Sequence, residues 1–430
     1  MKKVLILAYY FPPLGMGGTQ RVAKFVKYLP SYGWQPVVVT VKDVAYYAKD
    51  PTLLHDVAAS EIYRTGSLDP QRILAALSPV RSKSKDADSS AGQLWGFLRR
   101  LAAWLCIPDS KVLWLPFAAL KALRIIRAGG IECIFTTAPP HSVHLAGLFL
   151  KKTTGRPWIA DFRDGWSGGN FQFEPTPFHK WLNRLLERRV LRHADTVLSV
   201  SEGLTEKLRQ QNEIHPEKCA TITNGYDAED VDKVPLAYEE KFTITFCGAV
   251  TALTPLTGFF KALSSVFQTH PSLRDEITVK LVGKNLTGKL CEEIRHYALE
   301  NVVTCTGYVS HRQALENVLN ADLLLYPIAP GVSCDFVPGK TFEYLVSGKK
   351  IMAIGPCVEG VKILKAITTI ELFAHENITE IGNSICNSYS NMKKQRRNDK
   401  KRIMNTQFER KELTRKLVHI FDTFNVAIQE

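Results

Sequence analysis

Short apolar runs alternate with amphipathic segments along the first half of the chain. Val4–Ala8 is a continuous apolar run, and apolar residues at helical spacing follow it from Val22 to Leu29. The strands expected from such runs are Val4–Ala8, Pro36–Val41, Glu132–Thr136, Trp158–Asp161 and Thr196–Val200. Strands that alternate with helices belong to parallel sheets, which are buried on both faces. The pattern therefore predicts a parallel sheet with helices on both sides.

The same alternation starts again after a charged segment, Ala228–Lys241. The expected strands of this second series are Phe242–Gly248, Ile277–Val282, Val302–Thr306, Asp322–Pro327 and Lys350–Ile354. A chain of 430 residues is also long for a single core. We expect an N-terminal Rossmann-like domain at residues 1–235, a second one at 236–405, and a final helix within 406–430.

Composition narrows the class of protein. The formal net charge of +13 indicates an anionic partner, which could be nucleic acid, an acidic membrane surface or a phosphate-bearing substrate. The nine cysteines include no C-x-x-C pair, so we expect free thiols in a reducing compartment. No signal-peptide cleavage site follows the first apolar run, and no stretch reaches the roughly 18 apolar residues of a spanning helix. These features predict a cytoplasmic protein, with peripheral contact to the inner face of the cell membrane as an open alternative.

The stretch most informative about chemistry is Asp335–Gly348, which reads D-F-V-P-G-K-T-F-E-Y-L-V-S-G. Pro338 predicts the start of a helix whose first turn holds Gly339 and Lys340. A helix N-terminus with a lysine suits a phosphate group. Glu343 lies about one turn further on and can face the same pocket, where a carboxylate can accept hydrogen bonds from sugar hydroxyls. The spacing alone also fits an ordinary strand–loop–helix with acidic residues near the helix start.

Two polar motifs follow expected strands of the first half. His141 and His144 come after a proline pair in the sequence T-A-P-P-H-S-V-H. Their imidazoles could bind an acceptor hydroxyl or phosphate, or the segment could only cap a helix. Asp161 and Asp164 flank Arg163 in the sequence D-F-R-D-G-W. These charges could pair within the loop, or they could bind an acceptor and handle a proton beside an anomeric carbon.

Two further segments carry weaker signals. Apolar residues between Leu94 and Leu105 share one helical face, with Arg99 and Arg100 beside it, which suits either an interfacial helix or a helix packed on a domain core. Asp86 and Asp88 form a D-x-D sequence of the kind that can hold a metal ion. Because they lie in a charged, serine-rich tract, we expect a loop and no metal site there.

The strongest motifs resemble one family, the family-four retaining glycosyltransferases of GT-B fold. The spacing of Asp335 and Glu343 resembles its acid-x7-acid motif, in which the first acid is more often Glu. D-F-R-D-G-W resembles the D-F-R-D-P-W signature of the branch that builds bacterial surface polysaccharides, with Gly165 in place of Pro. Arg163 stands where many relatives have His. The Y-F-P-P opening with its glycine pair and Arg21 is also similar to the family's first loop.

The resemblance implies an architecture and a set of roles. In the GT-B fold two Rossmann-like domains face each other across a cleft, and the C-terminal helix packs back on the first domain. The residues expected to act in catalysis are Asp164, Arg163, His144, Asp335 and Lys340. The residues expected to bind the donor are Gly17, Gly18, Gly248, Lys261, Gly339, Lys340 and Glu343. The residues expected to bind the acceptor are Arg21, His141, His144 and Asp161. The arginine that relatives often carry after the glycine of F-x-G is absent here, and Lys261 is a loose match to their lysine.

The expected function is that of a retaining glycosyltransferase of bacterial cell-surface polysaccharide biosynthesis, such as capsule or lipopolysaccharide. It would move a sugar from a UDP- or GDP-linked donor to a lipid-linked saccharide. We expect no cofactor and no metal, an anionic membrane surface as partner, and no nucleic acid, since no aromatic-basic recognition motif occurs. Two rivals stay open, namely a GT-B sugar-nucleotide epimerase and a non-catalytic GT-B scaffold.

Overall fold

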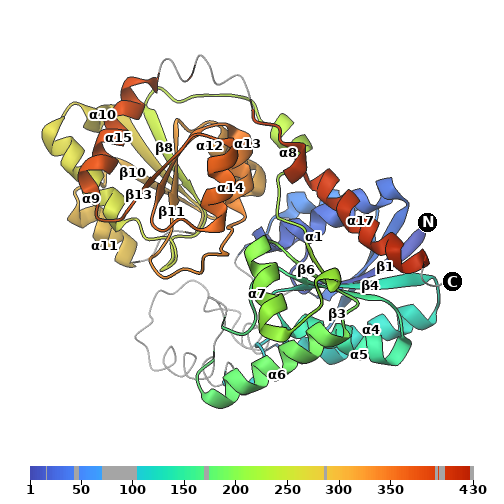
Figure 1. Cartoon of the computed structure of the whole chain (residues 1–430). Coiled ribbons are helices and arrows are strands. Elements are labelled where there is room, and N and C mark those ends of the chain that lie inside the picture. The colour runs from blue at the N-terminus through green and yellow to red at the C-terminus, as the bar shows by residue number, and fades with distance from the viewer. Residues whose placement is uncertain are drawn as a thin grey trace, which may run out of the picture. The chain divides into compact units, whose positions relative to one another are not determined.

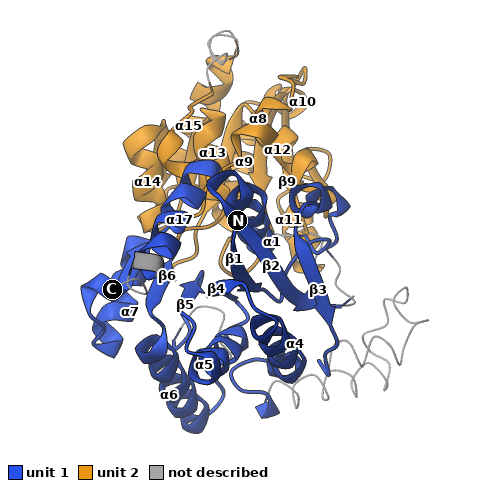
Figure 2. Ribbon diagram, turned by 90° about the vertical axis from the view of Figure 1, so that its right-hand side faces the viewer, with its two compact units in different colours: residues 1–223, 411–430 blue, residues 224–410 orange. Residues whose placement is uncertain are grey.

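A computed structural model describes residues 1–15, 17–42, 48–69, 104–168, 174–284, 288–392, 396 and 402–426. The chain divides into two compact units (Figure 2): unit 1 comprises residues 1–223 and 411–430, and unit 2 comprises residues 224–410. The sequence-based limit at residue 235 lies inside unit 2, because Tyr226, Val231 and Val234 pack in a core cluster of that unit. Each unit contains one parallel sheet, which confirms the predicted pair of Rossmann-like folds.

Unit 1 contains a seven-stranded parallel sheet in the order β3-β2-β1-β4-β5-β6-β7. The strands are β1 (Lys2–Leu7), β2 (Trp34–Val41), β3 (Glu61–Thr65), β4 (Ile131–Ala138), β5 (Trp158–Phe162), β6 (Thr196–Ser199) and β7 (Cys219–Thr221). Leu5 of β1 pairs with Val37 on one side and with Ile134 on the other. The order of connection reverses between β1 and β4, and open α/β sheets bind ligands beyond the carboxyl ends of the strands at such a point.

Helices cover both faces of this sheet (Figure 1). They are α1 (Gly17–Tyr28), α4 (Leu115–Arg127), α5 (Ser142–Thr154), α6 (Pro177–His193), α7 (Glu202–Asn212) and α17 (Arg410–Val426). Alternate strand residues serve opposite faces: Leu5 belongs to the core cluster with α4, α5, α6 and α7, whereas Ile6 belongs to the cluster with α1 and α17. The two-residue period of a strand produces this division.

Unit 2 contains a six-stranded parallel sheet in the order β10-β9-β8-β11-β12-β13. The strands are β8 (Phe242–Cys247), β9 (Ile277–Val282), β10 (Val303–Gly307), β11 (Leu323–Pro327), β12 (Lys350–Ile354) and β13 (Ile370–Phe373). Here the order reverses between β8 and β11. The loops that follow β8 and β11 are thus the expected position for a ligand.

The helices of unit 2 again form two groups. They are α8 (Ala228–Asp232), α9 (Thr257–Thr269), α10 (Leu273–Glu276), α11 (Gly288–His296), α12 (His311–Leu319), α13 (Lys340–Ser347), α14 (Glu359–Ile367) and α15 (Ile378–Ser390). Buried residues of α9, α11 and α15 share one core cluster, and those of α8, α12, α13 and α14 share the other. The described short 3-10 turns are Leu29–Tyr32, Pro51–Val57, Val112–Trp114, Pro216–Lys218 and Thr406–Phe408.

Candidate functional site

The side chain of Lys340 lies among three aromatic rings in unit 2. Its ammonium nitrogen is 3.9 Å from the centre of the Phe246 ring, 5.5 Å from that of Tyr326 and 6.0 Å from that of Tyr344. Aromatic faces attract a cation electrostatically. Gly339 is the N-cap of α13, so the lysine also lies at the positive end of a helix. This group of one lysine and three aromatic rings, which we call the Lys340 pocket, places positive charge at the start of α13 beside a ring of β8.

Hydrogen bonds from the ring hydroxyls fix two of these aromatic side chains. The Tyr344 hydroxyl accepts a bond of 2.9 Å from the backbone N–H of Cys247 and donates one of 3.1 Å to the carbonyl of Leu325. The Tyr326 hydroxyl shares a bond of 2.7 Å with Thr341. The tyrosines therefore tie β8, β11 and α13 together, and their position does not depend on a ligand.

Burial lowers the pKa of Lys340 to about 7, although nearby Cys247 and Glu343 oppose the shift. Burial also raises the pKa of the Cys247 thiol to about 12, so that thiol carries no charge at neutral pH. Among the described residues we find no hydrogen-bond acceptor for the lysine ammonium. The charge of Lys340 is therefore sensitive to its surroundings near pH 7, and an incoming anion would favour the protonated form.

Glu343 lies one turn after Lys340 and is held by a histidine that the sequence analysis did not select. Its Oε1 is 3.0 Å from Nε2 of His311, at the start of α12, and Nδ1 of that histidine is 3.7 Å from a carboxylate oxygen of Asp230. The carboxylates lie on either side of one imidazole, and this arrangement orients Glu343. The only sequence signal for His311 was its position directly after a serine that begins a helix.

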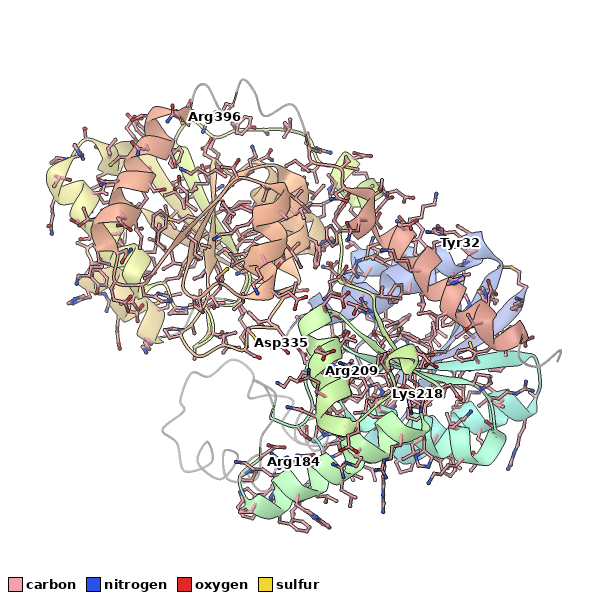
Figure 3. All side chains as sticks on the ribbon, in the orientation of Figure 1. Tyr32, Arg184, Arg209, Lys218, Asp335 and Arg396 are labelled. Atoms are coloured by element: carbon pink, nitrogen blue, oxygen red, sulfur yellow. The ribbon has the colours of Figure 1, made fainter. Side chains whose placement is uncertain are left out.

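The other site residues predicted in unit 2 lie at different places. Asp335 is half-buried in the loop before α13 and accepts a hydrogen bond from the Ser333 hydroxyl (Figure 3). Gly248 has a φ of +132°, and a Cβ placed there would lie 3.9 Å from the Lys340 ammonium. Lys261 is exposed in the second turn of α9, and α9 packs on the opposite face of the sheet from α13. The structure thus groups Gly248, Gly339, Lys340 and Glu343 and leaves Lys261 outside this group.

In unit 1, Arg21 and Asp161 form a buried ion pair. The Nη2 of Arg21 is 2.8 Å from Oδ1 of Asp161, and Nε is 3.1 Å from Oδ2. Arg21 also donates to the carbonyl of Thr223, and Asp161 accepts from Thr137. Both side chains are at most 1 % exposed and joined to protein partners. Their role in acceptor binding stays a prediction, and it would require this pair to open.

Arg163 joins three backbone segments and does not pair with the aspartates beside it. Its guanidinium donates to the carbonyls of Ala138 (2.9 Å), Pro139 (2.7 Å) and Gly18. A Cβ at position 18 would lie 3.3 Å from Nη1 of Arg163, so glycine there permits the close approach. The alternative of ion pairing within the D-F-R-D loop is wrong for Asp161, which pairs with Arg21. Instead, Arg163 holds the end of β4 against the start of α1.

His141 and His144 are buried beside aromatic rings. The His141 ring stacks on Trp166 with centres 5.1 Å apart, and His144 lies 4.4 Å from Phe162. Burial lowers the pKa of His141 to about 3 and that of His144 well below its usual value, with the charge of Arg163 acting in the same direction. Both imidazoles are therefore neutral. Within the described residues, Nδ1 of His141 and Nε2 of His144 have no hydrogen-bond partner.

The alternative that this segment caps a helix is wrong for the side chain of His141. His141 is the N-cap of α5 but its side chain makes no capping bond. Asp109 acts in its place, because its carboxylate accepts from the backbone N–H of Ser142 at 2.9 Å and from the Ser142 hydroxyl at 2.8 Å. The histidines are thus not needed to start the helix.

Asp164 is half-buried directly after Arg163. Burial raises the pKa of its carboxyl group, and the Arg163 charge partly opposes the shift. A carboxyl group with a raised pKa holds a proton more readily than an ordinary one, which suits a group that exchanges a proton with a substrate. Gly17 and Gly18 begin α1, so the backbone of the first glycine loop lies at a helix N-terminus.

The described residues contain neither a cluster of metal ligands nor a membrane-spanning helix. No group of three or more His, Cys, Asp or Glu side chains there could hold a metal ion. Asp86 and Asp88 lie outside the described residues, as does the segment 94–103 of the expected interfacial helix. No described helix combines the length and apolar character needed to cross a membrane.

Both units resemble parts of known proteins. The family model described as a glycosyl transferase 4-like domain matches residues 16–225. Over 143 residues the chain is 30% identical to the N-acetylgalactosamine-N,N'-diacetylbacillosaminyl-diphospho-undecaprenol 4-alpha-N-acetylgalactosaminyltransferase of Campylobacter jejuni. That match covers 32% of this chain and 38% of the relative, so it spans well under half of either protein.

Two solved structures cover nearly the whole chain. Anabaena HepE, solved in complex with UDP and glucose, has a TM-score of 0.62 and 15% identity over 98% of this chain and all of its own. A glycosyltransferase of Rickettsia africae has a TM-score of 0.61 and 16% identity over 98% of each chain. The chain therefore shares the fold of these structures, and residues 16–225 match the model of a glycosyl transferase 4-like domain.

Proposed function

We propose that this protein is a retaining glycosyltransferase of bacterial cell-surface polysaccharide biosynthesis. It transfers a sugar from a nucleotide-sugar donor to a lipid-linked saccharide, without a metal ion, at the cytoplasmic face of the membrane. Unit 2 binds the donor and unit 1 binds the acceptor. The observation that carries the proposal is the Lys340 pocket, in which a half-buried lysine at a helix N-terminus stands one turn from the carboxylate of Glu343.

The chemistry of donor cleavage explains the composition of this pocket. When the bond between sugar and diphosphate breaks, negative charge grows on the departing diphosphate. Preorganised cations and helix N-termini stabilise such charge best when they are shielded from water. In our proposal the backbone at Gly248 and Gly339 and the charge of Lys340 hold the diphosphate. Glu343 accepts hydrogen bonds from the ribose, and Asp335 contacts the donor sugar.

Unit 1 supplies the acceptor side in this proposal. Asp164 accepts and returns a proton of the acceptor hydroxyl. Arg163 positions the loop through its hydrogen bonds to three backbone carbonyls of other segments. Among the described residues, Nδ1 of His141 and Nε2 of His144 have no hydrogen-bond partner, and in our proposal these neutral imidazoles bind acceptor hydroxyls. Arg21 and Asp161 support this loop as an ion pair.

Two relatives support particular substrates. The Campylobacter jejuni enzyme acts, by its name, on a diphospho-undecaprenol-linked acceptor, which supports a lipid-linked acceptor here. The Anabaena structure contains UDP and glucose, which favours a UDP-linked donor over a GDP-linked one. The epimerase alternative stays relevant, because a Listeria monocytogenes protein described as a putative UDP-N-acetylglucosamine 2-epimerase shares the fold with a TM-score of 0.55 and 11% identity.

The test is release of nucleoside diphosphate by the purified full-length protein. A panel of UDP- and GDP-sugars is incubated with and without a synthetic undecaprenyl-diphosphate-linked monosaccharide. We expect release that depends on this acceptor and a product whose anomeric configuration, read by NMR, equals that of the donor. Conversion of the donor without acceptor would indicate the epimerase, and donor binding without any reaction would indicate the scaffold. An inverted product would refute the retaining mechanism.

A further inference from the structure

Exposed apolar side chains gather on one side of unit 1. Thirteen large apolar residues are exposed in the described chain, and six of them lie on α4, the turn before it, α5 and α6. These six are Leu113, Phe117, Leu120, Phe149, Phe178 and Trp181. The three helices pack side by side, α4 on α5 and α5 on α6, against the same sheet face (Figures 1 and 2). We call their solvent-facing side the α4–α6 surface.

Charge on the three helices is almost entirely positive. Helix α4 carries three basic residues, α5 two and α6 five. The single acidic residue in these helices is Glu187, which is buried and points away from solvent. Lys151 of α5 is paired with Asp195, so the charge available to a partner comes mainly from α4 and α6.

Helix α6 shows the arrangement most clearly. Phe178 and Trp181 are 57% and 58% exposed, and their ring centres are 5.8 Å apart near the helix start. Arg184, Arg188 and Arg192 follow at four-residue intervals and are all exposed, and Figure 3 labels the first of them on this helix. Residues that share a helix face recur at this spacing. One exposed face thus combines an aromatic pair with a row of arginines.

The other helical face of unit 1 provides an internal comparison. Helices α1 and α17 carry no exposed large apolar residue among their described side chains. Helix α17 also mixes signs, with Glu412 paired to Arg415 and Asp422 paired to Lys2. Among these described helices of unit 1, the combination of apolar and basic side chains thus occurs on the α4–α6 surface and not on α1 and α17, so it is not a general result of the +13 charge.

We propose that the α4–α6 surface binds an anionic phospholipid bilayer. Aromatic rings prefer the headgroup level of a bilayer, where their apolar body is covered and their edges stay wet. Long basic side chains reach phosphate groups while their methylene stems cover apolar surface. An amphipathic surface with aromatic and basic residues and no exposed acid is typical of interfacial helices. The proposal deepens the function proposed above by placing the acceptor-side unit on the membrane, yet it can be tested without any substrate.

The test is flotation of the full-length protein with vesicles. One set contains phosphatidylcholine alone, and the other contains phosphatidylcholine mixed with phosphatidylglycerol. We expect binding to the anionic set only, reduced by added salt. The variant Arg184→Glu with Arg188→Glu should lose at least about tenfold in binding, since each basic residue near such a surface contributes roughly fivefold. Phe178→Ala with Trp181→Ala should weaken binding at every salt concentration.

Matched controls lie in unit 2. Lys362→Glu with Lys365→Glu on α14 changes the net charge equally, and both lysines are exposed. Leu236→Ala with Met404→Ala removes two exposed apolar side chains elsewhere. Both controls should bind vesicles like the wild type. Equal loss in the controls, equal binding to neutral vesicles, or no binding to either set would overturn the proposal. Binding of duplex DNA that only Arg184→Glu with Arg188→Glu abolishes, without vesicle binding, would assign the surface to nucleic acid.

Membrane binding and catalysis can fail separately. Flotation uses no donor and no acceptor, so an inactive protein can still float. If acceptor-dependent release of nucleoside diphosphate fails while flotation behaves as expected, the transferase proposal is refuted and the surface assignment stands. The opposite result would leave the transferase without this docking surface.

Discussion

The ammonium nitrogen of Lys340 lies 3.9 Å from the centre of the Phe246 ring. The ring covers part of the half-buried lysine side chain, and burial lowers the pKa of the lysine to about 7. A nucleotide sugar carries no group that titrates near this pH. We therefore expect its dissociation constant to rise above about pH 7, by up to about tenfold per pH unit, as Lys340 loses its proton. Isothermal titration calorimetry with the donor at pH values below and above 7 measures this change in the dissociation constant.

Lys340→Arg is the control for this pH dependence. A guanidinium stays protonated throughout, so the variant should bind the donor with an affinity that changes little with pH. A flat profile in the wild type, or the same slope in both proteins, would show that another group is responsible.

Glu343 is expected to bind the nucleoside ribose. Glu343→Gln should weaken donor binding by roughly 1–3 kcal/mol, which is the cost of losing a charged hydrogen bond. His311→Ala should weaken it less, because the carboxylate remains but loses the imidazole that orients it. Titration of both variants with the donor measures these losses. The control is Glu316→Gln on α12, whose carboxylate pairs with Arg312. An unchanged dissociation constant for Glu343→Gln contradicts the assignment.

Catalysis is expected to proceed without a divalent metal. The α13 N-terminus and Lys340 can neutralise the departing diphosphate, so Lys340→Ala should lower turnover about a hundredfold or more. Treatment with EDTA should leave the wild-type rate nearly intact. Loss of activity with EDTA and recovery with magnesium or manganese would refute this expectation and direct attention to Asp86 and Asp88.

The Arg21–Asp161 pair is expected to be structural. Arg21→Met should lower the free energy of unfolding by roughly 3–5 kcal/mol, because it leaves a buried carboxylate without its cation. Arg21→Met combined with Asp161→Leu should cost less than the single change, since no charge stays unpaired. Urea denaturation of both variants tests this. If the double variant is the less stable one, the buried charge is not the cause.

The strong apolar runs predicted most of both sheets, but three of the four edge strands, β3, β7 and β13, were not among the expected strands. Strand β3 reads E-I-Y-R-T and β13 reads I-E-L-F, and most of their side chains are partly exposed. An edge strand contacts one neighbour only, so its sequence need not be continuously apolar. Such segments become strands because β2 and β12 offer them free hydrogen-bonding groups.

The candidate site was predictable where its residues share one helix. Helical spacing alone brings Lys340 and Glu343 together. The rings of Phe246 and Tyr326 and the imidazole of His311 belong to other elements. No local sequence pattern predicts that these side chains lie beside Lys340 and Glu343. Two arginines of the charged sequence at residues 393–402 show the same limit. Arg396 pairs with the buried Asp322, and Arg402 donates to the carbonyls of Val231 and Val234.

Helix α17 returns to unit 1, where Phe421 packs 5.1 Å from Trp34 and Asp422 pairs with Lys2. During synthesis, strand β1 therefore leaves the ribosome about 400 residues before the helix that covers its face, a delay of roughly 20–80 s. During this interval α17 does not yet cover Trp34, Phe135 and the side chains around them. The first unit to be made is thus the last to be completed, and the nascent chain presents an apolar sheet face to chaperones until its final helix emerges.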